Sequence, residues 1–123
     1  MVRLVLLGLC LFEFSAPFVA QESVQYVDGN RLLENCDEAS QSRMYCFGYI
    51  AGAMDSQVTL INSLKAATKT QNKTGIYCLP KGGIELGQAL RVTVKWLKDH
   101  PEKLHLPGDI LIGLALRDAF ACK

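Results

Sequence analysis

The stretch "ENCDEASQSRMYCFGYIAGAMD", residues 34–55, holds the pattern that decides the fold. It contains the end of one helical pattern, a short polar connection and the beginning of a second, longer helical pattern. Cys36 and Cys46 stand on either side of that connection. Their role depends on the compartment of the chain, because thiols oxidise in exported proteins and stay reduced in the cytosol.

The N-terminus has the pattern of a secretory signal peptide. Arg3 supplies a short positive region, and an apolar run follows over residues 4–12. This run is too short to span a bilayer, which needs about 20 apolar residues. Ala20 is the best small residue before a cleavage point. We therefore expect a cleaved signal over residues 1–20, a single exported domain over residues 21–123, and no membrane insertion of the mature chain; an uncleaved anchor is the alternative.

The charge of the chain argues against nucleic acid as a partner. The whole sequence has 13 basic and 12 acidic residues, a formal net charge of +1. Loss of residues 1–20 would remove one of each, Arg3 and Glu13, and leave that balance unchanged. No block of like charge stands out, so the composition indicates one ordinary domain of modest size.

Four cysteines remain after the expected cleavage: Cys36, Cys46, Cys78 and Cys122. An even number in a small exported domain indicates two disulfides, and four cysteines allow three pairings. We favour Cys36–Cys46, which would close a helix-to-helix connection, and Cys78–Cys122, which would tie the C-terminus to the middle of the chain. A zinc site would call for a close cysteine pair that the sequence lacks, so we expect no metal and no cofactor.

The clearest element is a helix over residues 42–65. Its apolar residues recur at alternating spacings of three and four, which is the helical period. The predicted stripe consists of Met44, Phe47, Ala51, Met54, Val58 and Ile61. Shorter helical patterns cover residues 27–36, 84–100 and 110–120, the last apolar nearly all round and so expected in the core. With no convincing pair of strands, the sequence predicts an all-α bundle of about four helices.

Several residues of the long helix have two interpretations. Gly48 and Gly52 lie four apart on one face, where small residues allow either tight packing in the core or contact with a second chain. Tyr45 and Tyr49 share another face and suit core packing or partner binding. Asp55 is expected to be partly buried, with a structural or recognition role.

The sequence offers little for catalysis. His100 and His105 are the only histidines, and a proline between them keeps them off one helix face. We expect them to be structural or surface residues. No nucleophile motif, phosphate-binding loop or dinucleotide fingerprint is present, so we expect no catalytic residue.

The mature chain resembles a known family from about residue 32 to residue 122. The matching pieces are Cys46-x-x-Tyr49-Ile50-x-Gly52-x-x-Asp55, Cys78-x-Pro80, Gln88, Leu97-x-x-His100-Pro101-Glu102 and Ala115-Leu116-x-x-Ala119-Phe120-x-Cys122. Together and in this order they resemble the resistance-associated immunity proteins that neutralise type VI secretion amidase effectors. Ala121 departs from the pattern, in which a proline precedes the last cysteine, and this affects only the local turn.

The resemblance implies an all-helical, disulfide-stapled periplasmic protein that is often a homodimer. It further implies that the chain binds a peptidoglycan amidase from neighbouring cells and blocks its active-site cleft without any catalysis of its own. The motif residues Tyr49, Gly52, Asp55, Pro80, Gln88, His100 and Pro101 would then be structural. A periplasmic stress or chaperone-like module without a toxin partner has the same composition and is the alternative.

The sequence suggests one segment for contact with an amidase. Residues 67–75, "ATKTQNKTG", are polar and end in glycine, so we expect an exposed loop. A protruding loop suits a cleft. Its candidate binding residues are Lys69, Gln71, Asn72 and Lys73.

Overall fold

A computed structural model of the chain describes residues 26–68 and 75–123. The expected signal over residues 1–20 lies outside these residues. The described helices are α1 (Gly29–Cys36), α2 (Arg43–Thr68), α3 (Leu86–Asp99) and α4 (Gly108–Ala119), with one 3₁₀ turn, η1 (Pro101–Lys103). Within the described ranges the only strand-like pairing is a single bridge between Asp28 and Pro107. The predicted all-α fold of four helices is confirmed.

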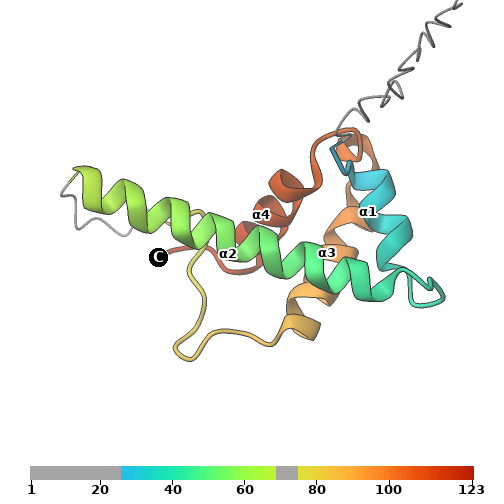
Figure 1. The fold of residues 1–123 in the computed structure, drawn as a ribbon, viewed down its shortest axis with the longest axis horizontal. Coiled ribbons are helices and arrows are strands. Elements are labelled where there is room, and N and C mark those ends of the chain that lie inside the picture. The colour runs from blue at the N-terminus through green and yellow to red at the C-terminus, as the bar shows by residue number, and fades with distance from the viewer. Residues whose placement is uncertain (1–25, 69–74) are drawn as a thin grey trace, which may run out of the picture.

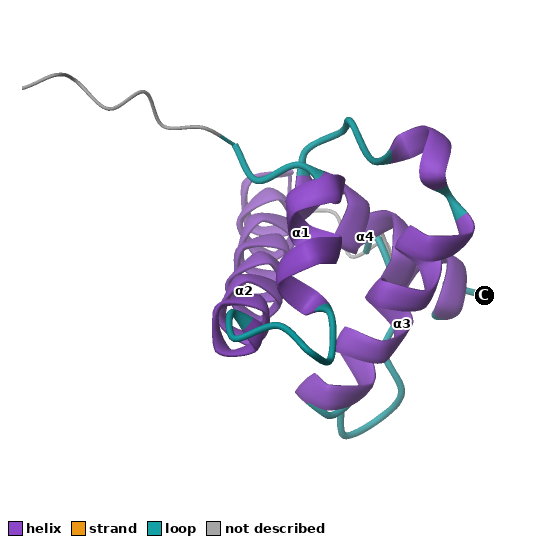
Figure 2. Cartoon of the chain, turned by 90° about the vertical axis from the view of Figure 1, so that its right-hand side faces the viewer, coloured by secondary structure: helices purple, strands orange, loops and turns teal. Residues whose placement is uncertain are grey.

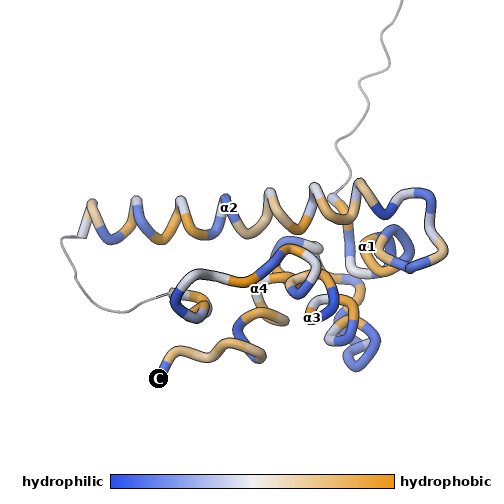
Figure 3. Tube along the Cα trace, turned by 90° about the horizontal axis from the view of Figure 1, so that it is seen from below, coloured by the Kyte–Doolittle hydropathy of each residue, from blue (hydrophilic) through white to orange (hydrophobic). Residues whose placement is uncertain are grey.

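The long helix α2 forms one side of the molecule. In Figure 1 it crosses the whole view, and Figure 2 shows α1, α3 and α4 grouped to one side of it. Figure 3, seen from below, places α2 as a rod with the other elements all beneath it. One long face of α2 is therefore left uncovered by the other described residues.

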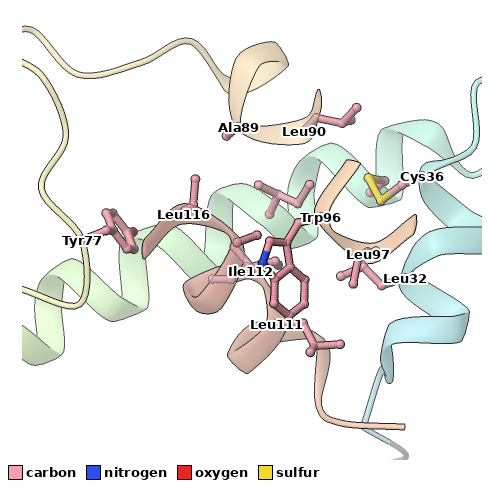
Figure 4. Close-up of a cluster of buried hydrophobic side chains, with 14 residues drawn as sticks. Leu32, Cys36, Tyr77, Ala89, Leu90, Trp96, Leu97, Leu111, Ile112 and Leu116 are labelled. Carbon is pink, nitrogen blue, oxygen red and sulfur yellow. A yellow bond between two sulfur atoms is a disulfide. The ribbon is translucent and has the colours of Figure 1, made fainter. Parts of the chain in front are cut away.

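The core lies between α2 and the group of the three shorter helices (Figure 4). Leu32 from α1, Ile50 from α2 and Leu97 from α3 are fully buried there. The largest contribution comes from α4, which buries Leu111, Ile112, Ala115 and Leu116. The expected central position of the last helix is thus confirmed, and it follows from its nearly continuous apolar surface.

Local signals explain where the helices begin and end. The side chain of Asp28 caps α1 by accepting a hydrogen bond from the backbone N–H of Arg31 at 2.9 Å. At the end of α3, His100 closes the helix with its backbone N–H on the Leu97 carbonyl, and Pro101 prevents its continuation.

Both preferred disulfides are present, Cys36–Cys46 and Cys78–Cys122. Cys36 and Cys46 are 1% and 0% exposed and join α1 to α2 inside the core. Cys78 and Cys122 are exposed and join the segment before α3 to the C-terminus. The Cys78 N–H also donates to the Phe120 carbonyl at 2.8 Å, so this connection has a backbone component as well.

The difference in exposure predicts the order in which the disulfides are reduced. An attacking thiolate must reach a sulfur atom, and a buried disulfide becomes accessible only when the structure opens. With dithiothreitol under native conditions we expect Cys78 and Cys122 to become alkylated first, with Cys36–Cys46 roughly tenfold slower or more. Peptide mapping by mass spectrometry after timed alkylation measures both rates. Equal rates would contradict this prediction.

Candidate interaction surface

Only part of the predicted stripe packs against the body, where Phe47 and Met54 are half-buried against the core. The buried residues of α2 are Cys46, Ile50 and Ala53. Met44, at the start of the predicted stripe, is 80% exposed, and Val58 near its end is 46% exposed. The stripe expectation is wrong in part, because α2 carries apolar residues on several sides, so that its spacing fits more than one face.

The interpretation of Gly48 and Gly52 as core-packing residues is also wrong within this chain. Both are exposed, and a Cβ atom at either position would have no atom outside the local helix within 4 Å. Asp55 is exposed as well, which corrects the expectation that it is partly buried. Tyr45 is half-exposed and its ring stacks on that of Tyr49, with centroids 6.1 Å apart.

The open space at Gly52 leads to a stability prediction. An exposed glycine inside a helix costs about 0.5–1 kcal/mol relative to alanine. We expect Gly52→Ala to raise the free energy of unfolding of the monomer by about that amount, measured by urea denaturation of the oxidised protein at a concentration too low for self-association. A loss of stability would show that the Gly48/Gly52 face packs closely against another part of the chain.

The second half of α2 projects beyond the body of the molecule. Figures 1 and 3 show its last turns running past the other helices. Leu60 and Leu64 lie about two and three turns beyond Ala53 on the same face of α2, yet they are 57% and 55% exposed. We call Gln57–Thr68 the arm. Its leucines are exposed because the body ends before it reaches them.

A second projecting feature is the turn that follows Cys78. The Gly83 N–H donates to the Pro80 carbonyl at 2.9 Å and closes a tight turn with Lys81 near its tip. Gly82 and Gly83 have φ angles of 91° and 78°, which side-chain-bearing residues rarely adopt. Half-buried Leu79 and Ile84 hold the two ends of the turn against the core. The sequence showed a proline and glycine turn here, but not that it projects.

The other motif residues lie apart from these features. Tyr49 is half-buried beside Gly108, where a Cβ would come within 3.2 Å of its ring and hydroxyl. Burial, and then the Asp109 carboxylate, raise the pKa of Tyr49 above its ordinary value. Gln88 is exposed on the first turn of α3, and Pro101 begins η1.

His100 belongs to a small cluster between α3 and α4. Its ring stacks on Trp96 with centroids 4.0 Å apart, and its Nδ1 lies 2.8 Å from the Trp96 carbonyl oxygen. The Trp96 indole N–H donates to the Asp118 carboxylate at 2.8 Å. This hydrogen bond, and then Arg117, lower the pKa of Asp118. The cluster ties the two helices together, which is a structural role for His100.

Tyr77 is buried near the base of the arm. It is 8% exposed, and its hydroxyl has no hydrogen-bond partner in the described part of the chain. Burial, and then the nearby Asp55 carboxylate, raise the pKa of Tyr77 above its usual value. The phenol is therefore protonated at neutral pH and keeps a hydrogen to donate. No sequence pattern singled out this residue.

The predicted binding residues Lys69, Gln71, Asn72 and Lys73 lie outside the described residues. What the structure describes are the two ends of their segment, Thr68 at the tip of the arm and Gly75 near its base.

Among residues 26–68 and 75–123, no group of three or more histidine, cysteine, aspartate or glutamate side chains could hold a metal ion. Within the same described ranges, no helix is both long enough and apolar enough to cross a membrane. The described surface has two notable features: the exposed apolar residues of α2 and the projecting turn at Pro80–Gly83. Exposed apolar surface of this kind is typical of protein–protein recognition.

Comparison with known proteins gives one match. Residues 28–122 match the family model described as Rap1a immunity proteins. No curated protein and no solved structure matches this chain.

Proposed function

This chain belongs to the Rap1a immunity protein family, and from this premise we propose that it binds a type VI peptidoglycan amidase effector and occludes the active-site cleft of that enzyme. The observation that carries the proposal is the uncovered, apolar α2 in a chain of an immunity family. Five of its large apolar side chains are exposed: Met44, Tyr45, Val58, Leu60 and Leu64. A helix that is apolar on several sides is normally buried, so we infer that another protein covers the exposed residues of α2.

The arm and the turn at Pro80–Gly83 are the parts that suit a cleft. Both project, and both are held by ordered structure at their base: the arm by continuous helix, the turn by Leu79, Ile84 and the Cys78–Cys122 disulfide. Such preorganisation reduces the entropy lost on binding. The segment with Lys69, Gln71, Asn72 and Lys73 would extend the same surface from the tip of the arm. Inhibition by occlusion asks for no catalytic group in this chain.

The proposed location is the periplasm, reached by cleavage of the signal over residues 1–20. Two disulfides support it, because disulfides persist in oxidising compartments and are rare in the cytosol. Peptidoglycan is hydrolysed in the same compartment, so inhibitor and enzyme would meet there.

We further propose that the chain is a homodimer that uses the Gly48/Gly52 side of α2. This face is exposed and lacks large side chains over those two positions, so another helix could approach closely. By the helical period it lies on the side of α2 opposite the buried residues Cys46, Ile50 and Ala53. Sedimentation of the mature protein tests this: a monomer at micromolar concentration would contradict it.

The test of the function uses the oxidised mature protein and a panel of recombinant peptidoglycan amidases that type VI systems deliver. Hydrolysis of purified peptidoglycan and titration calorimetry report inhibition and stoichiometry. We expect one amidase to be bound stoichiometrically and inhibited. Inhibition of none would overturn the proposal, and weak binding to many unfolded proteins would indicate a chaperone-like module.

A further inference from the structure

A groove of about 250 Å³ runs along the base of the arm. One wall is a single helix face of α2, formed by Val58, Ile61, Asn62 and Lys65 at spacings of three, one and three. The other wall is the short extended segment Gly75, Tyr77 and Cys78, which leads directly into the projecting turn. The groove therefore lies between the two features proposed to enter the amidase.

The polar groups of this groove are mainly hydrogen-bond donors that lack partners. The Lys65 ammonium and the Asn62 amide have no hydrogen bond or ion pair to any residue that the structure describes. The buried Tyr77 hydroxyl has none either. Figure 4 shows the Tyr77 ring reaching from its segment toward α4, and the residue is 8% exposed. A buried hydroxyl without a partner destabilises the folded chain, because its hydrogen bonds to water are lost and not replaced.

The apolar residues of the groove set the rest of its chemistry. Val58 is exposed and Ile61 half-buried on the helix wall, and both stand beside the donors. A segment that fills the groove would therefore present an apolar side chain to the valine and isoleucine and oxygen acceptors to the donors. An acidic side chain would be attracted to Lys65, because none of the described lining residues is acidic. The Asp55 carboxylate is near Tyr77, ten residues before Lys65 on α2, so the acidic side chain would lie at the Lys65 end of the groove.

We propose that this groove receives a segment of the amidase in which an apolar side chain stands next to an acidic one. The Tyr77 hydroxyl is enclosed in the free chain, so the short segment that carries it shifts on binding and a backbone carbonyl of the amidase accepts its hydrogen bond. The inference rests on the proposed function, since it names how that partner is recognised. Tyr77 would be a binding residue whose unsatisfied hydroxyl is satisfied only in the complex.

Tyr77→Phe tests the proposal because it acts in opposite directions on the free protein and on the complex. Removing an unpaired buried hydroxyl leaves the unfolding midpoint of the free protein unchanged or raises it. Removing a hydrogen bond made only in the complex weakens binding by about fivefold to tenfold. The probe is the amidase that the wild-type protein inhibits, and calorimetry measures the affinity.

Two further variants locate the effect. Lys65→Glu should weaken binding by about tenfold, with a smaller loss at high salt. Lys98→Glu makes the same charge change at an exposed position of α3 that does not line the groove. This variant should bind the amidase within twofold of wild type. Tyr26→Phe is the control for Tyr77→Phe, because Tyr26 is 82% exposed and belongs to neither the arm nor the turn; it should leave both binding and the unfolding midpoint unchanged.

The outcomes separate this inference from the proposed function. If wild-type protein inhibits an amidase and Tyr77→Phe and Lys65→Glu bind it as tightly as wild type, the groove assignment is overturned and the function stands. If Tyr77→Phe lowers the unfolding midpoint of the free protein, the hydroxyl is satisfied within the chain and the assignment also fails. If wild-type protein inhibits no amidase, both fail together.

Discussion

The double variant Leu60→Asp, Leu64→Asp should lose at least about a hundredfold in affinity for the amidase while unfolding at nearly the wild-type temperature. Both leucines are more than half exposed on the arm, so substitutions there change folding stability by about 0.5 kcal/mol or less. In a complex that covers them, each buried leucine contributes about 1.5–3 kcal/mol. Two such losses correspond to a hundredfold or more.

A control with the same chemistry lies elsewhere on the surface. Ile110 on α4 is 50% exposed, similar to the two leucines, and it belongs to neither the arm nor the turn. Ile110→Asp should keep wild-type inhibition. Calorimetry and the peptidoglycan hydrolysis assay measure all three proteins. Equal binding by the arm variant and wild type would show that the arm stays outside the interface.

The second large effect concerns stability. Gly29→Ala should lower the free energy of unfolding by about 3 kcal/mol, at the upper end of the usual range for overpacked positions. A Cβ at Gly29 would lie 2.5 Å from Leu111 Cδ1 and 2.8 and 2.9 Å from the Cα and carbonyl oxygen of Leu104. Because two of these three atoms are backbone, the segment before α4 has to move as a whole.

That movement would also break hydrogen bonds that join the start of α1 to this segment. The Gly29 N–H donates to the Leu106 carbonyl at 3.1 Å, and the Asn30 N–H donates to the Leu104 carbonyl at 3.2 Å. Urea denaturation with the disulfides intact measures the loss. Gly87→Ala is the control, since its Cβ would meet only the flexible Arg91 side chain at 3.6 Å. Similar stability of both variants would contradict the close approach at Gly29.

Local sequence patterns were sufficient to predict the positions of the four helices. A helix depends on the spacing and end signals of consecutive residues, and all four helices lie within three residues of the predicted bounds. The expected start of the loop at residue 67 is wrong, because α2 continues through Ala67 to Thr68. The predicted helix positions also indicated the disulfide pairing. Cys36 and Cys46 lie at neighbouring helix ends, which favours their contact. The family motifs can also be recognised from the sequence alone, and the family match over residues 28–122 confirms the resemblance.

The candidate interaction surface could not be predicted from local sequence patterns. Tyr77 and the turn after it sit in short irregular segments, where periodicity has no meaning. Their burial and projection arise from contacts with α2, α4 and the C-terminus, which are distant in sequence. The residues suggested by polarity alone, 69–73, remain a prediction for the same reason, because polarity marks a surface and not a partner.

The sequence by itself determined that this chain is a disulfide-stapled bundle of four helices in an immunity family. Only the tertiary structure decided which side of α2 is buried and that its second half projects. The physical reason is that α2 is apolar on several sides, so its own residues allow more than one face to turn inward. Burial is set by the neighbours, and these cover Cys46, Ile50 and Ala53 but end before Leu60 and Leu64.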